Sequence, residues 1–270
     1  MSDEIRYFDT AHAGIDAMKA CTSRSYPRHS HDQYGIGVID AGGHSSWSGR
    51  GQVEAGPRGT ICCNPGEVTD GRAVAGVPRA WRMMYLEPSL VEGLFADVLE
   101  RNARDVALTE PSFFCDATRT AFDHAFGILA DPVASKNGLA VETALIGLVA
   151  RLRVRSTLRG HRPSVATGAV RAAKDRIDAD PAAPVTLMEL ANATGLSRYQ
   201  LLRAFARDLG ITPHAYVLQR RLELARQLLR ARCSAAETAV RAGFHDQPHL
   251  TRAFQRQFGV TPRRYAARLP

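Results

Sequence analysis

The fold of this chain is decided by one stretch, Leu201-Leu202-Arg203-Ala204-Phe205-Ala206-Arg207, followed by Gly210-Ile211-Thr212-Pro213 and Tyr216. The stretch returns 49 positions later as Leu250-Thr251-Arg252-Ala253-Phe254-Gln255-Arg256, Gly259-Val260-Thr261-Pro262 and Tyr265. A repeat at a fixed offset indicates one supersecondary unit that is built twice. Each copy predicts a helix, a sharp turn and a basic second helix, so the chain contains two helix-turn-helix units.

The composition is typical of a protein that folds in water. The chain has 270 residues, of which 45% are hydrophobic and 23% are charged, enough for two domains with separate cores. No run of 18 apolar residues predicts a membrane span, and the acidic start Met1–Arg6 does not resemble a signal peptide. The five cysteines are odd in number and lack metal-ligand spacing, which favours reduced thiols in a cytoplasm.

Positive charge is concentrated in the second part of the chain. Residues 1–160 contain 17 Lys and Arg against 19 Asp and Glu, whereas residues 161–270 contain 18 against 8. The balances of −2 and +10 give the net charge of +8. Only Lys174 among the 18 basic residues is a lysine, and arginine forks suit phosphates and base edges. The basic part is therefore predicted to bind nucleic acid.

The first part of the chain reads as strands followed by helices. Short apolar runs at residues 33–40, 60–64 and 79–86 are separated by Gly and Pro turns, which predicts a sandwich or barrel. After Pro88 the period becomes helical. Helices are expected near residues 90–98, 117–130 and 139–155. The last has an apolar stripe that either packs on its own sheet or forms a dimer seam: Val141, Leu145, Leu148 and Leu152.

The segment Thr157–Ser164 has no periodicity and contains Gly and Pro, so we place the domain boundary there. The expected domains are residues 1–160 and residues 161–270. In the second domain Thr186 and Glu189 form a capping-box pattern that starts the first supporting helix.

The first helix-turn-helix unit is expected to turn at Gly195 and to begin its second helix at the N-cap Ser197. The start of such a helix enters the major groove. There Arg203 can donate to guanine or to a phosphate, and Tyr199 can pack on a sugar or a thymine methyl group. Leu202 offers only apolar contact.

The second unit is expected to turn at Gly243, with Asp246 as the N-cap of a helix whose first turn contains Pro248. Between the two units, residues 216–229 predict one long helix that sets their separation. Each basic helix is followed by Gly-x-Thr-Pro, in which Gly ends one helix and Thr-Pro starts the next.

With these motifs residues 165–270 resemble the AraC/XylS family of bacterial transcription regulators. The most specific words are Ala239-x-x-x-Gly243-Phe244, Arg252-x-Phe254 and Gly259-x-Thr261-Pro262-x-x-Tyr265. The resemblance implies double-stranded DNA as a partner and assigns groove contacts to two sets of side chains. These are Arg198, Tyr199, Gln200 and Arg203 in the first unit, and Gln247, His249, Thr251 and Arg252 in the second.

Residues 26–88 resemble the cupin-type effector domain that many members of this family have. The matching words are Pro27-Arg28-His29-Ser30-His31-Asp32-x-Tyr34 and Asn64-Pro65-Gly66-Glu67-Val68-Thr69-Asp70-Gly71. The implied fold is α+β: a cupin-like β-barrel with a helical dimerisation hairpin, then an all-α domain with two helix-turn-helix units. We expect His29, His31 and Trp81 to contact a small-molecule effector.

His29 and His31 alternate along a predicted strand, so both rings could reach one metal ion. Metal-binding cupins also use a carboxylate nearby and a third histidine, where this chain has Gly35, Ile36 and Thr69. We therefore predict no metal, no other cofactor and no enzymatic activity.

The predicted function is sequence-specific, effector-responsive DNA binding by a cytoplasmic, nucleoid-associated homodimer that works with RNA polymerase. One alternative is a metal-dependent cupin enzyme with an appended DNA-binding module. Another is an interaction module whose basic helices bind an acidic protein.

Overall fold

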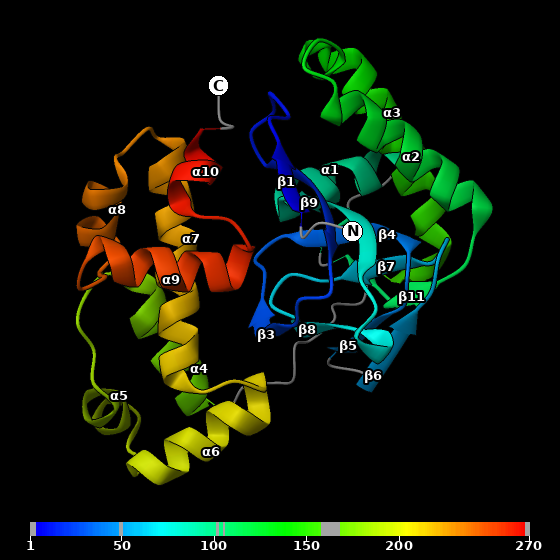
Figure 1. Cartoon of the computed structure of the whole chain (residues 1–270). Helices are drawn as coiled ribbons and strands as arrows, with labels where there is room; N and C mark the ends of the chain where they lie inside the picture. The colour runs from blue at the N-terminus through cyan, green and yellow to red at the C-terminus, as the bar shows by residue number, and fades with distance from the viewer. Residues whose placement is uncertain (1–3, 49–50, 101–102, 105, 158–167, 268–270) are drawn as a thin grey trace. The chain divides into compact units, whose positions relative to one another are not determined.

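The computed structural model describes residues 4–48, 51–100, 103–104, 106–157 and 168–267 (Figure 1). The chain divides into two compact units, the first formed chiefly by residues 1–26 and 30–161 and the second by residues 162–269. Most of the segment in which the domain boundary was predicted, residues 158–164, lies outside the described residues.

The first unit consists of two main sheets and one short strand pair. The sheet orders are β1-β2-β9-β4-β7-β11, β3-β8-β5-β6 and β10-β12. The strands are β1 (Glu4–Phe8), β2 (Ile15–Thr22), β3 (Tyr26–Ser30), β4 (Tyr34–Ala41), β5 (His44–Ser48), β6 (Gly51–Ala55), β7 (Thr60–Cys63), β8 (Val68–Ala73), β9 (Arg79–Leu86), β10 (Ala107–Leu108), β11 (Ser112–Phe113) and β12 (Ser156–Thr157).

The cupin-like, β-rich fold is confirmed, with its described strands hydrogen-bonded as two facing sheets rather than one closed barrel. The sequence-based prediction missed β1 and β2. Six of the eight residues of β2 are buried, because β2 lies inside the sheet between β1 and β9 with both faces covered. Such a strand lacks the polar–apolar alternation by which a half-exposed strand is recognised.

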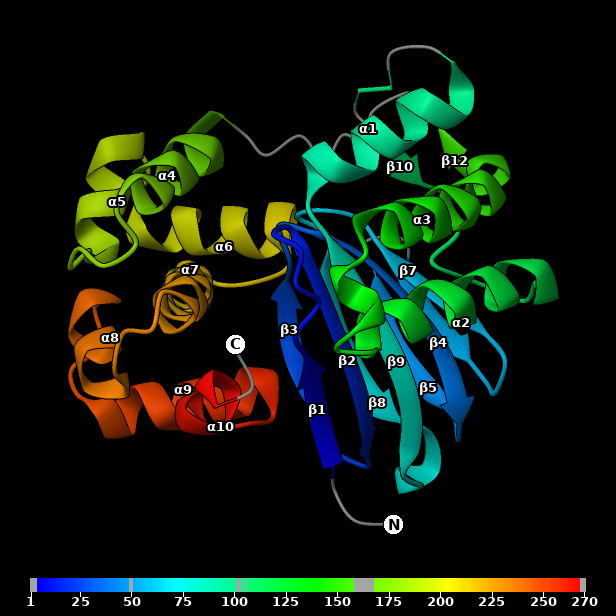
Figure 2. The ribbon, with the colours of Figure 1, turned by 90° about the horizontal axis from the view of Figure 1, so that it is seen from above.

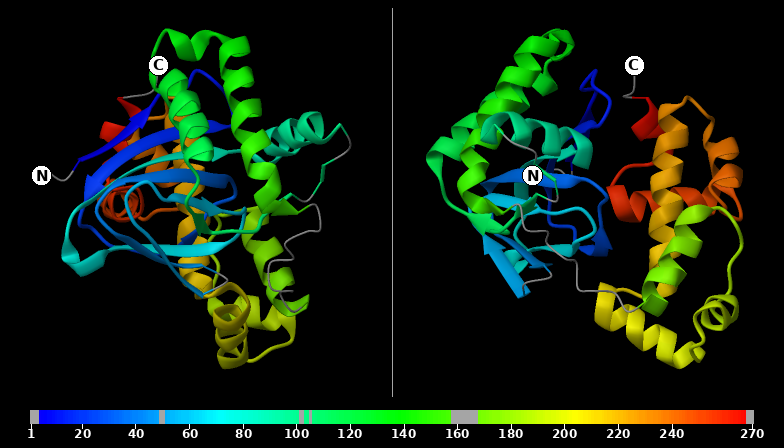
Figure 3. Two further views of the ribbon diagram at one scale, coloured as in Figure 1. Left: turned by 90° about the vertical axis from the view of Figure 1, so that its right-hand side faces the viewer. Right: turned by 180° about the vertical axis from the view of Figure 1, so that it is seen from behind.

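Helices α1 (Pro88–Leu99), α2 (Asp116–Ala130) and α3 (Gly138–Leu152) pack against one face of the six-stranded sheet (Figure 2). In Figure 3 the green helices α2 and α3 lie side by side, in agreement with their contacts. The stripe on α3 is buried in this core: Val141, Leu145, Leu148 and Leu152. The predicted packing on its own sheet is confirmed, and the dimer-seam alternative for this stripe is wrong.

A network of ion pairs fastens α2 to the sheet. Asp40, at the end of β4, accepts hydrogen bonds from Arg82 of β9 at 2.7 and 2.8 Å and from Arg119 of α2 at 2.7 Å. Arg82 also contacts Asp123 of α2 at 2.7 Å. The two arginines lower the pKa of Asp40 although burial opposes them. The network thus joins three elements that are far apart in sequence.

Within residues 168–267 of the second unit, all regular secondary structure is helical. The helices are α4 (Gly168–Ala179), α5 (Leu187–Thr194), α6 (Arg198–Leu209), α7 (Pro213–Arg230), α8 (Ala235–Arg241), α9 (Gln247–Phe258) and α10 (Pro262–Ala266). The long helix α7 contacts α4, α8, α9 and α10, so it is the central element of this unit. Its buried residues include Leu222, Ala225 and Leu229. Among the described residues, no helix combines the length and apolar character needed to cross a membrane.

Candidate DNA-binding surface and sensor interior

The first helix-turn-helix unit is formed by α5 and α6, and its local geometry follows the sequence. Thr186 and Glu189 make the predicted capping box at the start of α5. Gly195 ends α5 in the left-handed conformation, with φ of 68°, which permits the sharp turn. Ser197 then caps α6, and its own capping partner is Gln200. The start of α6 is therefore fixed by side-chain-to-backbone hydrogen bonds.

The predicted contact residues of the first unit are exposed. Tyr199 is 67% exposed, and the guanidinium of Arg203 lies 5.7 Å from the centre of its ring. Arg198 is exposed in the first turn. Gln200 is also exposed, but its Oε1 accepts a hydrogen bond of 2.9 Å from the backbone N–H of Ser197. Its carboxamide is thus oriented by the helix start.

The second helix-turn-helix unit is formed by α8 and α9. Asp246 caps α9 by accepting a 2.6 Å hydrogen bond from the backbone N–H of His249. The imidazole of His249 is half-buried and packs edge-on against Phe244, with the ring centres 5.2 Å apart. Gln247 and Arg252 are exposed, whereas Thr251 is half-buried. Of the four predicted contact residues of this unit, Gln247 and Arg252 therefore project most fully into solvent.

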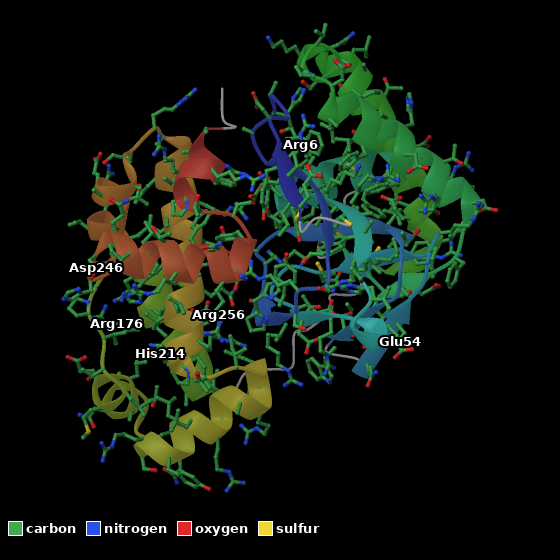
Figure 4. All side chains as sticks on the ribbon, viewed as in Figure 1. Arg6, Glu54, Arg176, His214, Asp246 and Arg256 are labelled. Atoms are coloured by element: carbon green, nitrogen blue, oxygen red, sulfur yellow. The ribbon has the colours of Figure 1, made fainter. Side chains whose placement is uncertain are left out.

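The two second helices, α6 and α9, begin on the same side of the helical unit. In Figures 1 and 2 both run in roughly the same direction, with α7 between them. Figure 4 labels Asp246 and Arg256 at the two ends of α9 and His214 at the start of α7. Two helix starts that face one way can contact one face of a DNA duplex.

The loop between α4 and α5, which leads into the first helix-turn-helix unit, contacts both α7 and the second helix-turn-helix unit. Arg221 of α7 donates hydrogen bonds to the carbonyl oxygens of Pro181 at 2.9 Å and Ala183 at 3.1 Å. The turn of the second unit packs against the same loop, since a Cβ atom on Gly243 would lie 2.4 Å from the carbonyl oxygen of Ala182. One loop thus contacts both the central helix and the second turn.

Within the helical unit, a hollow of about 290 Å³ lies between the two helix-turn-helix units. Leu202 of α6 and His249 of α9 both contribute to its wall, so the starts of the two helices open onto one shared space. The remaining lining residues come from the start of α5, from α7 and from the second turn: Val185, Leu187, Leu190, Pro213, His214, Val217, Leu218, Arg221 and Phe244.

The structure separates the three residues predicted to contact an effector. Trp81 is buried between the sheets, near Tyr26 and His44, with ring centres at 6.2 and 6.4 Å. His31 is also buried, but it packs on the ring of Tyr85 at 4.7 Å, four residues farther along β9.

His29 is half-buried, and its Nδ1 lies 2.7 Å from the carbonyl oxygen of Pro27. Among the described residues, no three His, Cys, Asp or Glu side chains are grouped to hold a metal ion. All five cysteines are reduced thiols.

Arg79, a charged residue in this interior, was not among the residues predicted from the sequence. Its side chain is fully buried, and its Nε donates a 3.0 Å hydrogen bond to Nδ1 of His44. The signal was present in the strand Arg79–Leu86, because alternate residues point to the same face. If Trp81 points inward, Arg79 must do so as well.

Comparison with known proteins agrees with this architecture. Residues 12–149, half of the chain, match the family model described as an AraC-like ligand binding domain. Residues 190–268 match a helix-turn-helix domain model. The first match spans most of the two-sheet unit with its helices, and the second spans both helix-turn-helix units.

Relatives of this chain include an uncharacterized HTH-type transcriptional regulator, YbfI, of Bacillus subtilis (strain 168). It is 25% identical over 234 residues, which are 84% of this chain and 82% of YbfI. The probable transcriptional regulator LumQ of Photobacterium leiognathi is 38% identical over 64 residues, 23% of this chain and 26% of LumQ.

Among solved structures, two of ToxT from Vibrio cholerae share the fold. An apo ToxT variant has a TM-score of 0.60 at 10% identity and covers 96% of this chain and 99% of ToxT. ToxT with a bound unsaturated fatty acid has a TM-score of 0.57 at 9% identity and covers 100% and 98%. The ligand-binding and helix-turn-helix matches, together with the structure, show that the chain belongs to the AraC family: it is a transcription regulator with an effector-binding unit and a DNA-binding unit.

Proposed function

We propose that the helical unit reads sequence through the exposed starts of α6 and α9, and that residues near 160 separate it from the sensor domain. The observation that supports this most directly is that both capped helix starts face the same side of one locked helical unit. They would enter two successive major-groove segments, roughly 34 Å apart. Arginine contacts to phosphates would make the affinity fall as salt increases.

The proposed base readers are the exposed side chains at the helix starts. Arg203 and Arg252 supply guanidinium forks, Tyr199 an aromatic face, and Gln247 a carboxamide. Arg198 would contact a phosphate. His249, Thr251 and Gln200 are retained as supporting contacts, because each has one side engaged within the protein or is partly covered.

The test is selection of binding sites from random duplex DNA with the full chain, followed by footprinting and a salt titration. We expect one enriched site with two conserved segments whose centres are one helical turn apart. Arg252→Ala should weaken binding to that site by about 1–3 kcal/mol and relax one base position. Arg256→Ala, in the last turn of α9, is the matched control and should leave base preference unchanged.

An equal loss by Arg252→Ala on the selected site and on random DNA would contradict base reading by this residue. Failure to enrich any sequence would contradict the proposed function as a whole. Specific binding at two segments would also exclude the interpretation of the basic helices as a surface for acidic proteins.

For the sensor domain we propose that a small-molecule effector binds between the two sheets and alters transcription rather than being chemically converted. Trp81 is the predicted effector residue with the strongest support, because it is buried at an inward position of β9. His31 would contact a ligand that extends toward Tyr85. His29, which is bonded to its own strand, is the weakest of the three candidates.

We further propose that the protein acts in the cytoplasm on the nucleoid, as a homodimer that works with RNA polymerase. The α3 stripe is buried, so a dimer must use other residues. Val133 and Leu139, which flank the junction of α2 and α3, are 82% and 75% exposed. Sedimentation analysis of Leu139→Glu tests this surface, since the substitution should shift a dimer toward monomer without unfolding the chain.

A further inference from the structure

The inward face of β9 contains one charged side chain among apolar and aromatic ones. Arg79, Trp81, Met83 and Tyr85 alternate with residues such as Met84, which belong to the core beneath the helices. Arg79 has a relative exposure of 0%. A buried cation is costly unless it is paired, so its partners require explanation.

Among the described residues, the hydrogen bonds of Arg79 go to neutral groups. Its Nε donates to His44, and its Nη1 donates to the carbonyl oxygen of Arg24 at 3.1 Å. The guanidinium carbon lies 4.7 Å from the centre of the Trp81 ring. Its Nη2 is buried without a hydrogen-bond acceptor, and among the described residues no carboxylate pairs with Arg79.

The charge of Arg79 is therefore uncompensated, in contrast to that of Arg82 on the same strand. Arg82 contacts the carboxylates of Asp40 and Asp123. Burial lowers the pKa of Arg79, yet a guanidinium stays protonated in proteins. Burial and the charge of Arg79 lower the pKa of His44 to about 4, so His44 is a neutral acceptor at pH 7.

A glycine, Gly71, lets the backbone of β8 lie close to the unpaired nitrogen. A Cβ atom on Gly71 of β8 would lie 3.3 Å from Nη2 of Arg79 and 3.3 Å from Cε1 of His44. Gly71 does not have the left-handed backbone that favours glycine, since its φ is not positive. Its missing side chain is thus explained by the close approach of Arg79 and His44 rather than by a turn.

We infer that the effector is an organic monocarboxylate whose carboxylate pairs with Arg79 and whose apolar body packs on Trp81. The one unpaired guanidinium charge of Arg79 matches one carboxylate better than a doubly charged phosphate. A guanidinium fork binds a carboxylate through two parallel hydrogen bonds. This inference rests on the proposed effector site between the sheets and assigns its chemical class.

The test uses thermal unfolding of the full chain with two carboxylates, hexanoate and benzoate, and their neutral amides, hexanamide and benzamide, at constant ionic strength. At least one carboxylate should raise Tm by about 3–6 °C at ten times its dissociation constant, as expected for a ligand that binds only the folded state. Both amides should leave Tm unchanged, because they cannot neutralise the guanidinium.

Arg79→Met should abolish the carboxylate response, whereas Arg72→Met should preserve it, since Arg72 is the exposed neighbour of Gly71 on β8. If Arg79→Met fails to fold, Arg79→Lys retains the charge without the fork and should raise the apparent dissociation constant at least tenfold. The inference is overturned if neither carboxylate shifts Tm, if an amide acts equally, or if the Arg79 variant that folds responds like the wild type.

Footprinting of the selected DNA site without any carboxylate tests DNA binding on its own, so that a failure of the effector proposal can be distinguished from a failure of the DNA-binding proposal. Wild-type protein and the folded Arg79 variant should protect the same base pairs in that experiment. Loss of the carboxylate response with intact protection therefore concerns the effector class alone.

Discussion

Gly243 lies directly against the backbone of Ala182: a Cβ atom at position 243 would be 2.4 Å from the Ala182 carbonyl oxygen. Gly243 also has a φ of 75°, which other residues adopt only at a cost. The turn between α8 and α9 therefore requires a glycine for two reasons: its backbone conformation is left-handed, and no room is left for a side chain.

Gly243→Ala should lower the free energy of unfolding of the helical unit by about 2–4 kcal/mol, because strain and steric overlap add. Urea unfolding followed by circular dichroism measures the loss. Gly195→Ala is the matched control, since Gly195 has a similar φ of 68° but open space around its Cβ position. It should cost only about 1–2 kcal/mol. Equal losses would show that the contact with Ala182 is unimportant.

Arg203→Ala should weaken binding to the selected DNA site by about 1–3 kcal/mol. Arg203 is exposed beside Tyr199 near the start of α6, where its guanidinium can reach a base edge or a phosphate. Arg207→Ala serves as the control, because Arg207 lies in the last turn and pairs with Asp208 at 2.6 Å. Fluorescence anisotropy at several salt concentrations distinguishes the two, and a larger effect of Arg207→Ala would contradict the predicted orientation of α6.

The buried His44 should make the stability of the β-rich first unit of the chain sensitive to mild acid. Its pKa is lowered to about 4 by burial and by Arg79, with Asp70 opposing, whereas the unfolded chain has the ordinary value near 6.5. Between these values the unfolded chain binds a proton that the folded chain excludes. The free energy of unfolding should therefore fall as the pH drops from 6.5 to 4, by about 3 kcal/mol in total.

Urea unfolding at pH 7.5, 6.5, 5.5 and 4.5 measures this dependence. His44→Gln can still accept the hydrogen bond from Arg79 but cannot titrate, so its stability should change less across the window. Parallel curves for the variant and the wild type would show that His44 is not the responsible group.

Asp40→Asn should lower the free energy of unfolding of the first unit by about 1–3 kcal/mol, because the charge-assisted hydrogen bonds to Arg82 and Arg119 are weakened. Thermal unfolding gives the measurement. Asp116→Asn is the control, since its ion pair with Arg58 is equally short, at 2.6 Å, but largely exposed. Exposed pairs contribute little, so this control should unfold like the wild type.

Local features of the helical unit could be predicted from sequence because the interacting residues are close along the chain. The capping box at Thr186 and the N-cap at Ser197 each join residues three positions apart, and both predictions are confirmed. The turn glycines Gly195 and Gly243 could be predicted for the same reason, since each adopts a left-handed backbone conformation that is local to its turn. Packing then places the two helix-turn-helix units on α7 without altering any helix start.

The sensor interior was harder to predict because its contacts join distant strands. Arg79 and His44 are 35 positions apart and meet only when β9 and β5 face each other from different sheets. The alternation of His29 and His31 predicted one strand face, but β3 ends at Ser30, and His31 packs on Tyr85 whereas His29 bonds to Pro27. Sequence patterns of this kind identify a strand and not its neighbours.

The loop at Ala182 also limits the spacing between the two DNA segments that this protein can contact. One added base pair between the two half-sites moves the second by about 3.4 Å and rotates it by roughly 35°. A regulator with a hinged connection could follow that change, but the loop that leads into α5 is bonded to Arg221 of α7 and packs against Gly243 in the turn before α9. Operators should therefore tolerate base substitutions more readily than insertions or deletions between their two halves.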